Sequence, residues 1–159
     1  MNKKNFIVTA VLLLVCATGA FAFSIGVQGG GSFTGGSSVG AGAAITFKLD
    51  SSPLVFAADL DFGDGFAVGL SADYWFLNDN IVGPLNYFIG VGAGFTIGGF
   101  NDDLLLNMAV RVPIGLNLFL VDGIIEPYIQ IVPMLSIPIM PNFDLRFVGA
   151  ANLGIRFWF

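Results

Sequence analysis

Residues 143–159 read FDLRFVGAANLGIRFWF, and this final stretch alternates between two kinds of side chain. Its odd positions are apolar residues or glycine throughout. Its even positions include the charged residues Asp144, Arg146 and Arg156. Because successive side chains of a strand point to opposite faces, the pattern predicts a strand with one uncharged and one polar face. A transmembrane β-barrel turns the first face to lipid and the second to its lumen.

The composition separates this chain from ordinary soluble domains. Of its 159 residues, 55% are hydrophobic and only 11% are charged, so lipid or detergent must cover much of its surface. A transmembrane helix needs about 20 consecutive apolar residues. The longest apolar run after the N-terminal segment, residues 104–120, is broken by polar residues, glycine and proline, among them Asn107, Arg111 and Pro113. Strands are therefore the expected spanning elements.

The N-terminal segment, residues 1–22, has the three parts of a secretory signal peptide. Lys3 and Lys4 make it basic at the start, residues 6–16 are apolar, and Ala20-Phe21-Ala22 fits a small-x-small cleavage site. We therefore predict export and a mature chain of one domain, residues 23–159.

The only cysteine, Cys16, lies in this leader, so the mature chain has no thiol. A lipoprotein with its lipid on Cys16 is an alternative, which the large Val15 before the cysteine disfavours. Without its two leader lysines the chain keeps four basic residues against 11 acidic ones. This charge has the wrong sign for binding nucleic acid.

Alternation and turn signals divide the mature chain into eight strands. The predicted strands are residues 23–33, 38–49, 54–63, 66–76, 85–98, 104–120, 124–139 and 143–159. The longest connection is then residues 77–84. Asp122-Gly123 predicts a type I′ hairpin turn that pairs Val121 with Ile124. The predicted fold is all-β, an eight-stranded antiparallel up-and-down transmembrane β-barrel.

Prolines inside predicted strands oppose a closed barrel, which has no edge on which to place them. In the predicted register Pro133 faces Val112, beside Pro113. We expect a bulge or a break in the hydrogen-bond ladder there. The alternative is that the strand ends near Val132.

The charged residues on inward faces form a predicted lumen network. Its members are Lys48, Asp59, Asp61, Asp73, Arg111, Glu126, Asp144, Arg146 and Arg156. An eight-stranded barrel is just wide enough for side chains to fill it, and buried charges need partners.

We predict an ion pair of Glu126 with Arg156, a contact of Lys48 with Asp73, and one of Arg111 with Asp59 or Asp61. Small inward residues in residues 38–49, 66–76 and 85–98 are expected to accept large ones from the rest of the barrel. Two interpretations stay open: a charge network that plugs the barrel, or a charged constriction in a narrow pore.

The chain has no histidine, which removes the usual general base, histidine-based triads and most zinc sites. Asp59 and Asp61 share a strand face where a cation could bind, but many lumen acids offer as much. We therefore predict no enzyme activity, no catalytic or metal-binding residues and no cofactor.

With its leader, eight amphipathic strands and ending, the whole mature chain resembles the small eight-stranded outer-membrane barrels of the OmpA transmembrane domain, OmpX and OmpW groups. The ending with Leu153, Ile155, Phe157 and Phe159 is similar to the C-terminal signal that the barrel-assembly machinery reads in that family. The resemblance implies a monomer in the outer membrane of a diderm bacterium, with outer-membrane lipid and the assembly machinery as partners.

The predicted function is that of an integral outer-membrane β-barrel with a largely side-chain-filled polar lumen and a structural or interaction role. The alternative is a narrow channel for small solutes or apolar ligands. A soluble secreted β-sandwich is a weaker third possibility, because its uncharged face would be exposed to water.

Overall fold

The computed structural model describes residues 22–159, apart from residues 36, 63–64, 101–102, 141–142 and 144. The predicted signal peptide, except its last residue, lies outside the described residues, as does Asp144. Within the described part the strands are β1 (Phe23–Thr34), β2 (Ser37–Leu49), β3 (Leu54–Phe62), β4 (Phe66–Val82), β5 (Leu85–Phe100), β6 (Asp103–Arg111), β7 (Ile114–Leu118), β8 (Ile125–Met140) and β9 (Arg146–Trp158).

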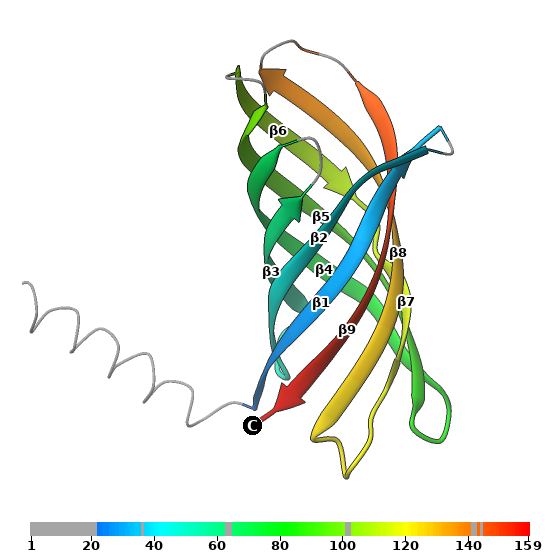
Figure 1. Ribbon diagram of the computed structural model, residues 1–159. Coiled ribbons are helices and arrows are strands. Elements are labelled where there is room, and N and C mark those ends of the chain that lie inside the picture. Colours follow the sequence, from blue (N-terminus) through cyan, green and yellow to red (C-terminus); the bar gives the residue numbers. More distant parts are fainter. Residues whose placement is uncertain (1–21, 36, 63–64, 101–102, 141–142, 144) are drawn as a thin grey trace, which may run out of the picture.

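These strands form one closed antiparallel barrel (Figure 1). Each strand from β1 to β5 pairs with the next, and β9 returns to pair with β1 from Ser24↔Trp158 to Phe33↔Gly149. β6 and β7 both lie between β5 and β8, so they are two parts of one interrupted strand. The ring thus has eight strand positions, which confirms the predicted fold.

The interruption falls at Val112 and Pro113, where the sequence predicted a break. Proline has no N–H to donate to the ladder, yet the neighbouring backbone groups are satisfied. Val112 N–H donates to the Pro133 carbonyl at 2.9 Å, and Gly90 N–H donates to the Pro113 carbonyl at 2.9 Å. The alternative that the strand ends near Val132 is wrong, because β8 continues to Met140.

The predicted connection over residues 77–84 is wrong. β4 continues to Val82, and only Gly83 and Pro84 separate it from β5. The polar residues that indicated a loop bond within the hairpin: Asn80 Nδ2 donates to the Gly83 carbonyl at 2.8 Å and to Asn86 Oδ1 at 2.7 Å. The result is a long hairpin at the end of the barrel that holds the C-terminus (Figure 1).

A β-bulge in β4 accompanies this extension. The register with β5 shifts between Trp75 and Leu77, which leaves Phe76 as the extra residue. Phe76 and Leu77 are both exposed on the outside, whereas Trp75 is 4% exposed inside the barrel. Bulges re-aim side chains in this way. Trp75 keeps the inward phase of Asp73, and the bulge turns Leu77 to the outside.

The last two hairpins keep the predicted register. Asp122 and Gly123 have φ values of 55° and 89°, as a type I′ turn requires, and Ile124 N–H donates to the Val121 carbonyl at 3.2 Å. Glu126 lies opposite Arg156, as predicted. β9 begins at Arg146, later than the predicted Phe143.

The two faces of the barrel differ as the alternation predicted. Outward residues such as Ile45, Leu70 and Leu153 are 62–66% exposed, and none of the large exposed side chains in the strand centres is charged. Five inward charged residues are at most 9% exposed: Lys48, Asp73, Arg111, Glu126 and Arg156. Asp59 is partly exposed, and Asp61 and Arg146 are exposed. Among the described residues, no helix is long and apolar enough to cross a membrane.

Inward glycines make room for the large inward side chains directly opposite them on the neighbouring strand. A Cβ atom at Gly26, Gly92 or Gly115 would overlap Arg156, Asp73 or Phe88, respectively. Gly90 and Gly154 accept Trp75 and Tyr128 in the same way. The complementarity predicted between the two halves of the barrel is instead a fit between paired neighbours.

We predict that Gly92→Ala destabilises the barrel by about 1–3 kcal/mol, because its methyl group would overlap the Asp73 carboxylate and the Ala72 carbonyl. Gly94→Ala is the matched control on the same inward face of β5, since its Cβ would have no neighbour closer than 3.8 Å. The measurement is equilibrium unfolding by guanidinium in lipid vesicles, followed by tryptophan fluorescence. Equal stabilities of the two variants would contradict the proposed fit.

Candidate functional site

A cluster of buried polar side chains fills the lumen toward the end that holds the termini, and Glu126 is its centre. Glu126 is 0% exposed. Its Oε1 accepts hydrogen bonds from Arg156 Nη1 at 2.9 Å and Asn117 Nδ2 at 2.7 Å, and its Oε2 accepts one from Trp158 Nε1 at 2.9 Å. The predicted ion pair of Glu126 with Arg156 is thus confirmed. We call this cluster, with the aromatic rings around it, the plug.

Aromatic rings enclose the cation of the plug. The Arg156 guanidinium lies 4.0 Å from the Tyr128 ring centroid and 5.0 Å from that of Trp75. Trp75 in turn stacks on Phe88 with ring centroids 3.8 Å apart. Cation–π contacts strengthen when water is excluded, so the rings stabilise the buried charge and also close the space around it.

Sequence reasoning missed Trp75 and Phe88 as lumen residues. Both occupy inward positions of the predicted strands, so the period of two contained the signal. Trp75 was hidden because Tyr74 and Phe76 flank it with further aromatic rings. Selecting inward positions by charge alone leaves out both of these uncharged aromatic residues.

Lys48 does not meet Asp73, contrary to the prediction. Its Nζ lies over two tryptophan rings, 5.0 Å from the centroid of Trp158 and 5.7 Å from that of Trp75. Asp73 pairs with Arg111 instead. The predicted level was right, because Lys48 and Asp73 both lie opposite Val55, on the two strands that flank β3. A shared level does not decide which partner each side chain contacts.

The Arg111–Asp73 pair forms the next layer, above the plug. Arg111 Nε lies 3.0 Å from Asp73 Oδ1, and both side chains are at most 10% exposed. Neither of these atoms is aligned for a hydrogen bond. The expected ion pair of Arg111 with Asp59 or Asp61 is replaced by this one.

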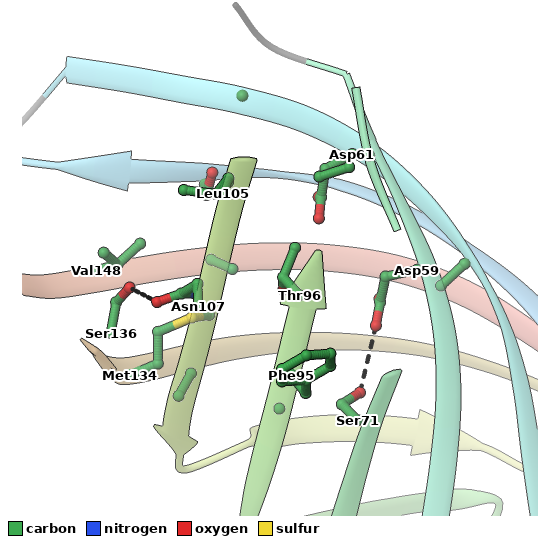
Figure 2. Close-up of a pocket in the computed structure, with 18 of the residues that line it drawn as sticks. Asp59, Asp61, Ser71, Phe95, Thr96, Leu105, Asn107, Met134, Ser136 and Val148 are labelled. Atoms are coloured by element: carbon green, nitrogen blue, oxygen red, sulfur yellow. Dashed lines mark hydrogen bonds between the residues drawn. The ribbon is translucent and has the colours of Figure 1, made fainter. Parts of the chain in front are cut away.

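Beyond this layer the lumen is hollow. A cavity of about 640 Å³ extends toward the end of the barrel opposite the termini, so the lumen is only partly filled. Figure 2 shows Asp59 and Asp61 on β3 among its lining residues, with Asn107, Met134, Ser136 and Val148. Ser71 Oγ donates to Asp59 Oδ2 at 3.4 Å, and Ser136 Oγ donates to Asn107 Oδ1 at 2.8 Å.

The other predicted site residues lie at the ends of the barrel or on its outside. Arg146 lines the cavity near its mouth, and Asp144 lies outside the described residues. Of the predicted assembly residues, Leu153, Phe157 and Phe159 are exposed and Ile155 is partly exposed. The described residues contain no group of three or more histidine, cysteine or acidic side chains that could hold a metal ion.

No protein-family model and no curated protein sequence matches this chain. Among solved structures, neisserial surface protein A (NspA) is similar, with a TM-score of 0.54, 16% sequence identity, and coverage of 87% of this chain and 97% of that protein. The outer membrane enzyme PagL aligns with a TM-score of 0.49, 16% identity, and coverage of 84% and 98% of the two chains. The likeness to NspA shows that this chain has the fold of a small eight-stranded barrel.

We predict that Glu126→Ala destabilises the barrel by about 3–5 kcal/mol, because it leaves the buried Arg156 without its carboxylate partner. The double variant Glu126→Leu/Arg156→Met is expected to recover part of this loss, since neither charge then remains unpaired. Guanidinium unfolding of both variants checks the prediction. The control is Asp79→Ala, an exposed residue of β4, which is expected to change stability by less than about 0.5 kcal/mol. A Glu126→Ala variant as stable as this control would contradict the prediction.

Proposed function

We propose that this chain is a monomeric integral barrel of the outer membrane of a diderm bacterium, closed toward its termini, with a structural or interaction role. Its apolar exterior and charged interior support a lipid surrounding, because a soluble monomer rarely exposes so continuous an apolar surface. The outer-membrane barrels that the sequence resembles have this same distribution of residues.

The plug is the observation that carries the proposal. Glu126, Asn117 and Arg156 are each at most 1% exposed, and they come from three strand positions on the wall. A conducting path for ions needs water-accessible polar groups along its length. A fully buried, mutually bonded charge cluster supports a closed lumen at this level.

Two partners belong to this proposal. Outer-membrane lipid covers the exterior, and the barrel-assembly machinery reads Leu153, Ile155, Phe157 and Phe159 during insertion. Their exposure on the outer side of β9 and at its end suits such reading. We propose no enzymatic role, because the chain has no histidine and the buried carboxylate Glu126 is already bonded to three donors.

A narrow channel is the second candidate function, and the cavity favours it. The cavity already provides a polar path through part of the lumen. Conduction would then require the plug side chains to move aside. This candidate keeps Arg111 in the path, since it lines the cavity.

Conductance of the refolded mature chain, residues 23–159, in a planar bilayer tests the proposal. We expect the parent to be silent, and the plug variant Glu126→Ala/Arg156→Ala to open steady steps, because it removes the cluster that closes the lumen. Asp79→Asn, outside the lumen cluster, is the control and is expected to stay silent. Heat-dependent mobility on gels and circular dichroism establish that each variant is folded. Steady openings in the parent that change with Arg111→Ala would instead support the channel.

A further inference from the structure

We infer that the cavity binds a small zwitterion, with the carboxylate of the ligand on Arg111 and its ammonium group on Asp59 and Asp61. The inference rests on the proposed function in one respect: because the plug closes the lumen, the cavity is open at one end only. The chemistry of the pocket depends on its own lining residues.

Arg111 supplies the anion-binding end. It lines the cavity and is 9% exposed, so its guanidinium has little access to bulk water. A guanidinium carries five N–H donors. Asp73 Oδ1 stands beside Nε at 3.0 Å without hydrogen-bond alignment, and no described residue accepts a hydrogen bond from Arg111. A buried cation with unused donors is costly, and a ligand carboxylate would satisfy them.

Asp59 and Asp61 supply the cation-binding wall. Figure 2 shows both side chains on β3 among the residues that line the cavity. Asp59 accepts one long hydrogen bond, from Ser71 at 3.4 Å, and Asp61 accepts none from the described residues. As alternate residues of one strand they lie about 7 Å apart. An ammonium group can therefore approach either carboxylate without displacing an existing partner.

The presence of both signs selects a zwitterion over a simple ion. A cation alone would leave Arg111 with no acceptor beyond the misaligned Asp73 carboxylate, and an anion alone would approach the two carboxylates Asp59 and Asp61. The volume of about 640 Å³ suits a small molecule. Leu105, Met134 and Val148 give it apolar surface for an aliphatic linker between the two charges (Figure 2).

Methyl NMR of the refolded chain, labelled with [¹³C-methyl]methionine in micelles, tests the inference. Met134 lines the cavity, whereas Met108 is 49% exposed on the outside and reports the state of the fold. The probes are ω-amino acids from 3-aminopropanoate to 6-aminohexanoate, with pentylammonium, pentanoate and 1-pentanol as single-charge and neutral controls. We expect the best ω-amino acid to shift the Met134 methyl at a concentration about tenfold lower than any control does, with Met108 unchanged.

Substitutions assign the two ends of the ligand. Asp61→Asn is expected to remove most of the preference for the ω-amino acid over pentanoate without weakening pentanoate itself, because Asp61 has no hydrogen-bond partner among the described residues to lose. Asp79→Asn makes the same charge change outside the cavity and should leave all binding unchanged. Arg111→Met should abolish the response to pentanoate. The Met108 methyl signal reports whether this variant is folded. If it is misfolded, the Asp61→Asn result alone tests the inference.

Three results would overturn the inference: a control that binds as tightly as every ω-amino acid, no Met134 shift with any probe, or an Asp61→Asn variant with unchanged preference. Steady conductance of the parent would overturn the closed barrel alone and leave this binding result standing.

Discussion

Closure of the backbone hydrogen-bond ladder between β1 and β9 is the constraint on which the structure depends. In hydrocarbon every backbone donor and acceptor must be satisfied within the protein, and a sheet does this only when it has no edge. Closure fixes the alternation of faces, because each strand must keep its apolar side outward all the way around. It also explains how prolines are tolerated. At Val112 and Pro113 the ladder loses strand geometry, yet adjacent donors still reach the Pro113 and Pro133 carbonyls.

A closed ring of eight strand positions has little room inside, and the lumen is organised by that limit. Several inward side chains are accommodated because a glycine stands opposite them, as Gly26 does for Arg156 and Gly92 for Asp73. The same economy of space brings the charges of the plug within 3 Å of their partners and surrounds Arg156 with aromatic rings. Packing and electrostatics are therefore coupled here. A glycine leaves space for the charged side chain opposite it, and the position of that space limits which partner the side chain can contact.

Local patterns in the sequence predicted the fold, most strand limits and the Glu126–Arg156 register. This worked because the period of two and the Asp122-Gly123 turn act over a few residues. Contacts across the lumen were not predictable. Lys48 and Asp73 share a level on the two strands that flank β3, but the Lys48 ammonium lies over Trp158, whereas Asp73 pairs with Arg111. The polar residues at 78–80 indicated a loop, because a turn and a solvent-exposed hairpin have the same composition. The cavity could not be predicted from the sequence, because its volume depends on the sizes and conformations of all the inward side chains together.

The charged side chains of the plug and those around the cavity differ in how their hydrogen-bonding groups are satisfied. This difference suggests a structural role for the plug and a binding role for the cavity. In the plug, Glu126 uses both carboxylate oxygens and its three donors come from the protein. Around the cavity and among the described residues, Asp61 has no hydrogen-bond partner, and Arg111 donates no hydrogen bond and meets Asp73 as an ion pair only. A barrel that needed only stability would gain by replacing an unpaired inward charge with an apolar side chain. Donors and acceptors on the wall of one cavity that the described residues leave without aligned hydrogen-bond partners are best explained by a partner that comes from outside.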